Sequence, residues 1–186
     1  MLPTDPRLNV QKEAVFRVEK ADLNQDLSAI ASVVNSAYKK VVYLKDDGKT
    51  SPADLKDIIS NPSKALYLCL STNNEICGTI LIQYDANRKK AELGMFAIHP
   101  RYQGANIGAI FANCVEKEIF KVVPEIILKV VPLEQAKLVK FYINLGYQFT
   151  GEKVPFSEEE TSKYIHPEYR DKVFMLIMSK KLHSNL

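Results

Sequence analysis

Residues 96–109 read FAIHPRYQGANIGA, an apolar strand that passes through a glycine-containing turn into the start of a helix. Such a turn can hold an anion, because small residues let the backbone approach a phosphate and the unpaired amides of the first helical turn point toward it. The helix dipole adds a favourable potential for negative charge. A purely structural explanation stays open as well, since Gly108 would also permit close packing of the helix on the sheet.

Two common phosphate motifs do not fit this stretch. A nucleotide P-loop requires G-x-x-x-x-G-K-[ST], and no lysine follows Gly108. A dinucleotide site requires G-x-G-x-x-G, which residues 103–108 (QGANIG) do not match. A diphosphate that is held by the backbone alone, without a metal, indicates a carrier such as coenzyme A.

The composition is that of one globular domain. The chain has 186 residues, of which 46% are hydrophobic and 25% charged, with only seven glycines and nine prolines. We expect a single domain over residues 1–186, with its core at about 15–180. The net charge is +3 and the basic residues are scattered, which disfavours a nucleic-acid binder.

The cysteines predict neither a disulfide framework nor a metal site. Cys69, Cys77 and Cys114 are an odd number without C-x-x-C spacing, and each falls in an apolar pattern that predicts a buried small side chain. Free thiols favour a reducing, cytoplasmic location. The first residues lack a signal-peptide pattern and no stretch has the length of a membrane span, so we expect neither export nor membrane insertion.

Periodicity predicts the elements around the opening stretch. Before it we expect a strand at 15–18, a helix at 27–41 whose capping box is Asp22 with Gln25, a helix from Ser51 to Asn61, and an antiparallel meander at 65–72, 76–84 and 91–98. After it we expect a helix at 107–119, a parallel strand at 126–131, a helix at 138–145 ended by Gly146, and strands at 147–151 and 173–179. Residues 152–170 give no clear pattern, apart from a capping box at Ser157 and Glu160. The fold class is therefore α/β (α+β), a mixed and mostly antiparallel sheet flanked by helices.

The turn resembles the coenzyme A motif of the GNAT superfamily of N-acetyltransferases, [QR]-x-x-G-x-[GA]. Gln103 and Gly108 match the ends of this motif, whereas Asn106 stands where the family has its middle glycine. Asparagine adopts left-handed backbone geometry more readily than most residues and keeps its amide, so we expect cofactor binding to persist.

A second match supports the resemblance over nearly the whole chain. Residues 138–147 (LVKFYINLGY) are similar to the family's late helix, and the order of elements agrees from about Val15 to Ser179. The resemblance implies a GNAT-like fold of about seven strands with a splayed parallel pair, and acetyl-CoA as cofactor. It assigns the pantetheine to Phe96, Ala97 and Ile98, and the diphosphate to Gln103, Gly104, Ala105, Asn106, Ile107, Gly108 and Ala109.

The same resemblance implies the catalytic residues. An ammonium group must lose a proton before it attacks a thioester, and the strand AELGMFAI (residues 91–98) is similar to that of histone acetyltransferases, in which the glutamate matching Glu92 is the base. Tyr142 matches the tyrosine that protonates the leaving sulfur, and the strand at 96–98 would supply an oxyanion donor. Without the resemblance, Glu92 reads as a solvent-facing carboxylate and Tyr142 as a core tyrosine.

We therefore expect an N-acetyltransferase that moves the acetyl group of acetyl-CoA to a primary amine by direct attack in a ternary complex. Two alternatives stay open, a non-catalytic acyl-CoA-binding or sensing module and transfer of a longer acyl group. The loops at 39–50 and 152–170 would shape the acceptor site, but their composition leaves open a small amine, an amino acid, a polyamine or a protein amine. A homodimer is one alternative for the oligomeric state.

Overall fold

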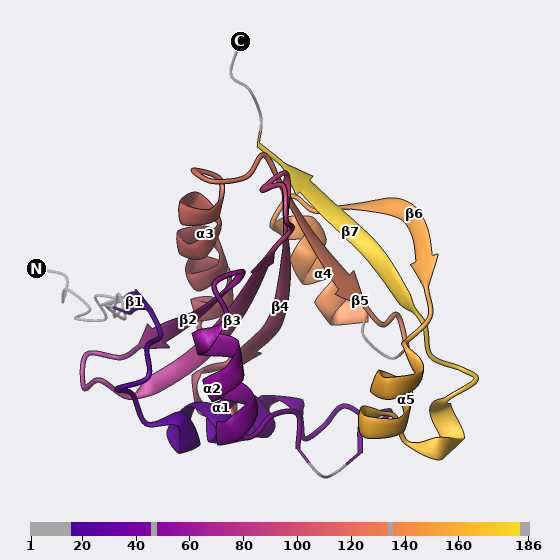
Figure 1. Ribbon diagram of the computed structural model, residues 1–186, viewed down its shortest axis with the longest axis horizontal. Helices are drawn as coiled ribbons and strands as arrows, with labels where there is room; N and C mark the ends of the chain where they lie inside the picture. The colour runs from indigo at the N-terminus through magenta and orange to yellow at the C-terminus, as the bar shows by residue number, and fades with distance from the viewer. Residues whose placement is uncertain (1–15, 46–47, 134–135, 183–186) are drawn as a thin grey trace, which may run out of the picture.

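A computed structural model describes residues 16–45, 48–133 and 136–182 of the chain (Figure 1). Within these ranges seven strands form one sheet in the order β1-β2-β3-β4-β5-β7-β6. Neighbouring strands are antiparallel except β4 and β5, which are parallel. The mixed, mostly antiparallel sheet with flanking helices confirms the predicted fold class. The elements are β1 (Arg17–Lys20), α1 (Leu27–Tyr38), α2 (Pro52–Ser60), β2 (Lys64–Leu70), β3 (Ile76–Tyr84), β4 (Lys90–Ile98), α3 (Ile107–Ile119), β5 (Glu125–Val130), α4 (Ala136–Asn144), β6 (Gln148–Val154), α5 (Glu158–Tyr164) and β7 (Met175–Lys181), with 3-10 turns at Pro100–Tyr102 and Pro167–Tyr169.

The alternation of side chains along the strands divides the core between two faces. Ala91 and Leu93 of β4 belong to the larger core cluster, together with Phe111 of α3 and Tyr142 of α4. On the opposite face, Ile30 of α1 and Leu55 of α2 pack with leucines of β2. Because successive side chains on a strand point to opposite faces, α3 and α4 cover one side of the sheet and α1 and α2 the other.

The helix starts follow from local hydrogen bonds, with one correction. Ser51 and Asp54 form a capping box at α2, and Ser157 and Glu160 form one at α5, as their spacing predicts. The predicted cap of α1 was wrong. The carboxylate of Asp26 accepts from the amides of Ser28 and Ala29, whereas the side-chain oxygen of Gln25 accepts from the Asp22 amide in the preceding turn.

The turns after α4 and after β2, and the three cysteines, also bear on the predictions from the sequence. Gly146 ends α4 with a φ of +94°, as predicted, and Asn74 takes a φ of +60° in the β2–β3 hairpin. Cys69 and Cys77 are buried, but Cys114 is exposed, so its predicted place on the apolar face of α3 was wrong. Val15 lies outside the described residues.

A β-bulge distinguishes β4 from an ordinary strand. Leu81 pairs with Gly94 and Thr79 with Ala97, so a single residue of β3 lies opposite two residues of β4, Met95 and Phe96. Met95 has a φ of +44°, which is strained for a residue with a side chain. The buried Thr79 hydroxyl donates to the Met95 carbonyl at 2.9 Å, and this bond holds the bulge in place.

A buried polar triad ties α3 to the last strands. Glu116 of α3 is only 3% exposed. Its carboxylate accepts from the Tyr147 hydroxyl at 2.8 Å and from the ammonium group of Lys180 on β7. Burial, and next the Glu116 charge, raise the pKa of Tyr147, so this hydroxyl keeps its proton and remains a donor. The triad therefore fixes the helix whose first turn forms the predicted anion site.

We expect Lys180→Met to lower the free energy of unfolding by about 3 kcal/mol, because it leaves the Glu116 carboxylate buried without its charge partner. Lys181→Met is the matched control, since this neighbouring lysine is exposed. Urea unfolding followed by circular dichroism measures both variants. Equal stability of the two variants would show that the Glu116–Lys180 pair does not hold α3.

Candidate functional site

The parallel strands β4 and β5 part from each other at the bulge. Their pairing runs from Lys90↔Glu125 to Leu93↔Leu128 and ends there. Beyond that point, residues 94–98 of β4 have no pairing with β5, although β3 still pairs with the other edge of the strand. One edge of the β4 backbone is therefore open to a ligand that can add hydrogen bonds in the way of a strand.

The end of β4 shows the direction of this open edge. The amide of His99 donates to the Cys77 carbonyl of β3 at 2.8 Å. The backbone N–H and C=O groups of successive residues in a strand point to opposite edges, so those of Ile98 point away from β3. The Ile98 carbonyl accepts from the Gln103 side-chain amide at 2.8 Å. Gln103 thus connects the turn after β4 to the open edge.

The turn into α3 presents a row of backbone donors. Gly104 has a φ of +89°, and a Cβ there would meet nothing within 4 Å. The first α-helical bond runs from the Ile110 amide to the Asn106 carbonyl at 3.2 Å, and no side chain caps the helix. The amides of residues 107–109 therefore have no acceptor within α3, and residues 103–106 are exposed. This is the geometry of an anion site at a helix N-terminus.

Asn106 takes the backbone conformation expected for it. Its φ is +59° and its ψ is 9°, in the left-handed region. Asparagine tolerates this region better than most residues with a side chain, so it replaces glycine without loss of the turn.

Gly108 lies where α3 approaches the sheet and α4. An added Cβ would lie 3.5 Å from the ring of Phe96 and 3.6 Å from Ile98 and Phe141, which is ordinary van der Waals contact. Close packing therefore brings α3 onto β4 but does not itself require glycine at this position.

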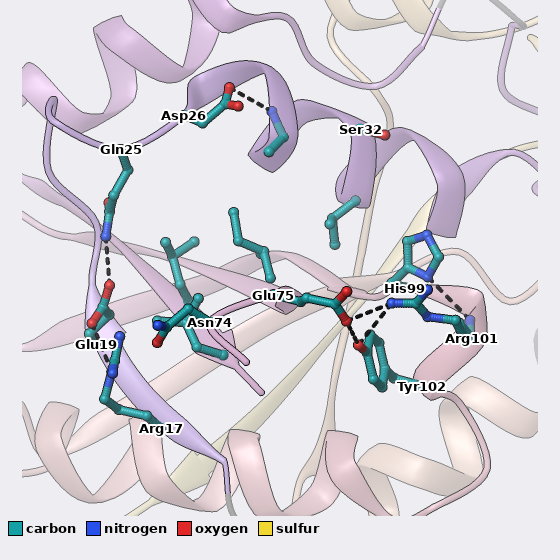
Figure 2. Close-up of a pocket in the computed structure, with 15 residues that line it drawn as sticks. Arg17, Glu19, Gln25, Asp26, Ser32, Asn74, Glu75, His99, Arg101 and Tyr102 are labelled. Carbon is teal, nitrogen blue, oxygen red and sulfur yellow. Dashed lines mark hydrogen bonds and ion pairs between the residues drawn. The ribbon is translucent and has the colours of Figure 1, made fainter. Parts of the chain in front are cut away.

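The turn is also fixed from the outside by residues of the β2–β3 hairpin. The Glu75 carboxylate accepts from Arg101 at 2.7 Å and from the Tyr102 hydroxyl, and these contacts hold the pKa of Glu75 below its usual range (Figure 2). The Nδ1 atom of His99 accepts from the Arg101 amide at 3.2 Å. These residues line a pocket of about 550 Å³ next to the first half of α1. Their side chains bind one another, so they position the turn.

Tyr142 lies beside the open edge. Its side chain is 6% exposed, and its ring centroid lies 6.3 Å from that of Phe96. Among the described residues its hydroxyl has no hydrogen-bond partner, and the hydroxyl oxygen is not fully buried. Burial, and next the Tyr38 hydroxyl, raise the pKa of Tyr142, so the group keeps its proton. Tyr38 comes from α1 on the opposite face, and its hydroxyl lies 3.4 Å from the Phe96 carbonyl, where β4 and β5 diverge.

Glu92 lies on β4, just before the strands separate, and the sequence did not reveal its partner. Lys129 of β5 donates to the Glu92 carboxylate at 2.9 Å, and the side chains are 35% and 37% exposed, respectively. Since Ala91 and Leu128 belong to the core on the α3 side, Glu92 and Lys129 point to the α1 side. Among the described residues, no group of three or more His, Cys, Asp or Glu could hold a metal ion.

The two loops expected to shape the acceptor site do come together. Leu44 and Ile165 form an isolated β-bridge, and the Lys45 amide donates to the Tyr164 carbonyl at 2.8 Å. Figure 1 shows α5 beside the loop that follows α1. A second pocket, of about 580 Å³, lies between these segments. No helix of the described residues is long and apolar enough to cross a membrane.

Comparisons with known proteins agree with this geometry. The family model described as "Acetyltransferase (GNAT) family" matches residues 30–147. An aminoglycoside 6'-N-acetyltransferase complexed with coenzyme A has a TM-score of 0.68 and 15% identity, over 91% of this chain and 99% of the other. The ribosomal-protein-S18-alanine N-acetyltransferase from Escherichia coli has a TM-score of 0.65 and 15% identity, over 92% and 99%. A spermidine/spermine N-acetyltransferase from Vibrio cholerae has a TM-score of 0.63 and 16% identity, over 89% and 92%.

The structural neighbours establish the fold, and the family model covers well over half of the sequence, from α1 to the start of β6. Both agree with the open edge of β4 and the row of free amides at α3. The chain therefore belongs to the GNAT family of acetyltransferases, which use acetyl-CoA as the acetyl donor.

Proposed function

We propose that the protein transfers the acetyl group of acetyl-CoA to a primary amine by direct attack within a ternary complex. The observation that carries this proposal is the open edge of β4, which leads directly from the amides of α3 to the hydroxyl of Tyr142. A single ligand with a diphosphate at one end and a thioester at the other would use all three parts.

The cofactor-binding roles follow from the two backbone surfaces. Phe96, Ala97 and Ile98 would bind the amides of the pantetheine arm through the open edge. Residues 103–109 would hold the diphosphate, with the amides of Ile107, Gly108 and Ala109 as its donors. Gln103, which bonds to Ile98, would act mainly by joining the two surfaces.

The proposed chemistry needs a base, an oxyanion donor and an acid. Glu92 would accept the proton of the ammonium group, directly or through water, and Lys129 would orient its carboxylate. A backbone amide at 96–98 would stabilise the negative charge on the thioester oxygen. Tyr142 would then give its proton to the departing sulfur.

We expect Tyr142→Phe to lower kcat by about 100-fold while the affinity for coenzyme A stays the same, because only the acid is removed. Thiol release with acetyl-CoA and a screened panel of amines measures turnover, and calorimetry measures affinity. Tyr169→Phe is the control, because it removes a tyrosine hydroxyl at a position away from the open edge of β4. Full turnover of Tyr142→Phe would eliminate the acid assignment.

The raised pKa of Tyr142 predicts how kcat depends on pH. Since burial raises the pKa of Tyr142, the acid remains protonated through the alkaline range in which an ordinary tyrosine would ionise. We therefore expect kcat of the wild type not to fall between about pH 8 and 10. A fall in kcat near pH 10 that Tyr142→Phe abolishes would mean that the hydroxyl titrates normally.

The variants Asn106→Gly and Asn106→Ala test the turn into α3, where the diphosphate is expected to bind. Alanine in the left-handed region costs about 1 kcal/mol, so we expect Asn106→Ala to lower stability by that amount and coenzyme A affinity by up to about fivefold. Asn106→Gly relieves the strain and should bind at least as tightly as the wild type. Urea unfolding and calorimetry measure both quantities, and equal values for alanine and asparagine would contradict the account.

The competing candidate is a module that binds acyl-CoA without catalysis. It would take up the cofactor but release no free thiol with any amine, and the screen above separates the two. Several further points remain proposals from the sequence: one acetyltransferase domain over residues 1–186, a cytoplasmic location consistent with three free thiols, and a homodimer.

A further inference from the structure

The second pocket has a chemistry that the catalytic account does not use. It lies between the C-terminal half of α1 and α5, and its volume of about 580 Å³ suits a small molecule. Its described lining carries four lysines and no carboxylate, namely Lys39, Lys45, Lys49 and Lys163. The neighbouring aspartates 46 and 47 lie outside the described residues.

The backbone that carries Lys49 is fastened to α1. The side-chain oxygen of Asn35 accepts from the amides of Lys49 at 2.7 Å and Thr50 at 3.0 Å. Its side-chain nitrogen donates to the Thr50 carbonyl at 2.9 Å. Three hydrogen bonds therefore fix the backbone from which the Lys49 side chain extends.

The ammonium group of Lys49 faces aromatic rings. Its Nζ lies 4.6 Å from the ring centroid of Tyr164 and 5.9 Å from that of Tyr38. Within the described residues it forms no ion pair, since the salt bridges involve other lysines. Burial lowers the pKa of Lys49, Glu160 acts in the opposite direction, and Lys163 adds to the lowering. The Glu160 carboxylate acts on Lys49 from a distance but forms no salt bridge with it. An anionic group that binds in direct contact with this desolvated ammonium group therefore gains free energy.

The other three lysines that line the pocket differ from Lys49 in their contacts and exposure. Lys163 pairs with Asp54 at 3.6 Å, and Lys45 donates to the carbonyl of Ser162. Lys39 is exposed. Lys163 is thus paired with a carboxylate, Lys39 and Lys45 add positive charge to the lining, and Lys49 can form a direct contact with an anion in the pocket.

Tyr38 connects the pocket to the reaction centre. It lines the pocket, and its hydroxyl lies 3.4 Å from the Phe96 carbonyl at the bulge of β4. The same hydroxyl raises the pKa of Tyr142. The Tyr38 side chain therefore extends from the pocket that holds Lys49 to the bulge of β4, beside which the thioester is expected.

We infer that the acceptor is a small amine that also carries a carboxylate or a phosphate, and that Lys49 binds this anionic group. The inference rests on the proposed transferase function. A polyamine, which the sequence leaves open, would meet repulsion from the lysines that line the pocket and would leave Lys49 without an anion in direct contact.

Matched acceptors test the inference on the full-length enzyme with acetyl-CoA. Amino acids are compared with their amides, phosphoethanolamine with ethanolamine, and both sets with spermidine. We expect kcat/KM to be at least about tenfold higher for the anionic member of a pair, which also distinguishes a carboxylate from a phosphate. Lys49→Met should raise KM for that member about tenfold with little change in kcat, Lys49→Arg should retain most of the affinity, and the exposed Lys56→Met should have no effect.

A binding measurement separates this inference from the transferase proposal. Calorimetry compares N-acetyl amino acids and O-phosphorylated N-acetylethanolamine with their uncharged counterparts, using enzyme saturated with coenzyme A. Tighter binding of the anions that Lys49→Met abolishes supports the inference even if no amine is acetylated, which would overturn only the transferase proposal. Equal or better use of amides, ethanolamine or spermidine, together with equal binding of charged and uncharged products, overturns the inference.

Discussion

The divergence of β4 from β5 is the constraint on which the rest of the structure depends. An extra residue at Met95 and Phe96 turns the strand, and the bond from the Thr79 hydroxyl to the Met95 carbonyl holds this turn. The pairing with β5 ends at Leu93, so one edge of the backbone stays open. The strained φ of Met95 is the local cost of this opening, and the well-packed cores on both faces make it sustainable.

The open edge brings together residues that are far apart in the chain. Tyr142 approaches it from α4 on one face and Tyr38 from α1 on the other, while α3 begins at its end. The helix is held at this place by Glu116 with Tyr147 and Lys180, and the turn before it by Glu75 with Arg101. The backbone donors and the Tyr142 hydroxyl that we propose as the acid thus lie along one edge, and the described residues include no cluster that could hold a metal ion.

The sequence predicts most of the fold because its patterns are local. The periodicity of the meander and of α3, the capping boxes at Ser51 and Ser157, and the left-handed turn at Asn106 are set by neighbouring residues. The cap of α1 was misplaced because Asp22 and Asp26 are both suitable caps, and only the path of the chain decides between them. Cys114 was misplaced because it stands at the edge of the apolar stripe.

The site is harder to predict from the sequence, because the residues that interact in it are distant in the chain. Residues 96–109 predict the cofactor side from the sequence because strand, turn and helix are contiguous there. Nothing local indicates that Lys129 pairs with Glu92, that Lys180 pairs with Glu116, or that Asn35 positions Lys49. The first two pairings arise because β5 lies beside β4 and because β7 joins the same sheet next to β5, and the third arises because the chain after α1 folds back onto that helix.

The most direct test of the account is a nuclear magnetic resonance titration of the isotope-labelled protein with coenzyme A, with the backbone amides as probes. The account predicts that the signals of residues 94–98 and 107–109 move together with one binding constant, while those of the β1–β2 edge stay in place. If coenzyme A binds and leaves both groups of amides unchanged, or if no amide responds at any concentration, then the opening between β4 and β5 is not the cofactor site.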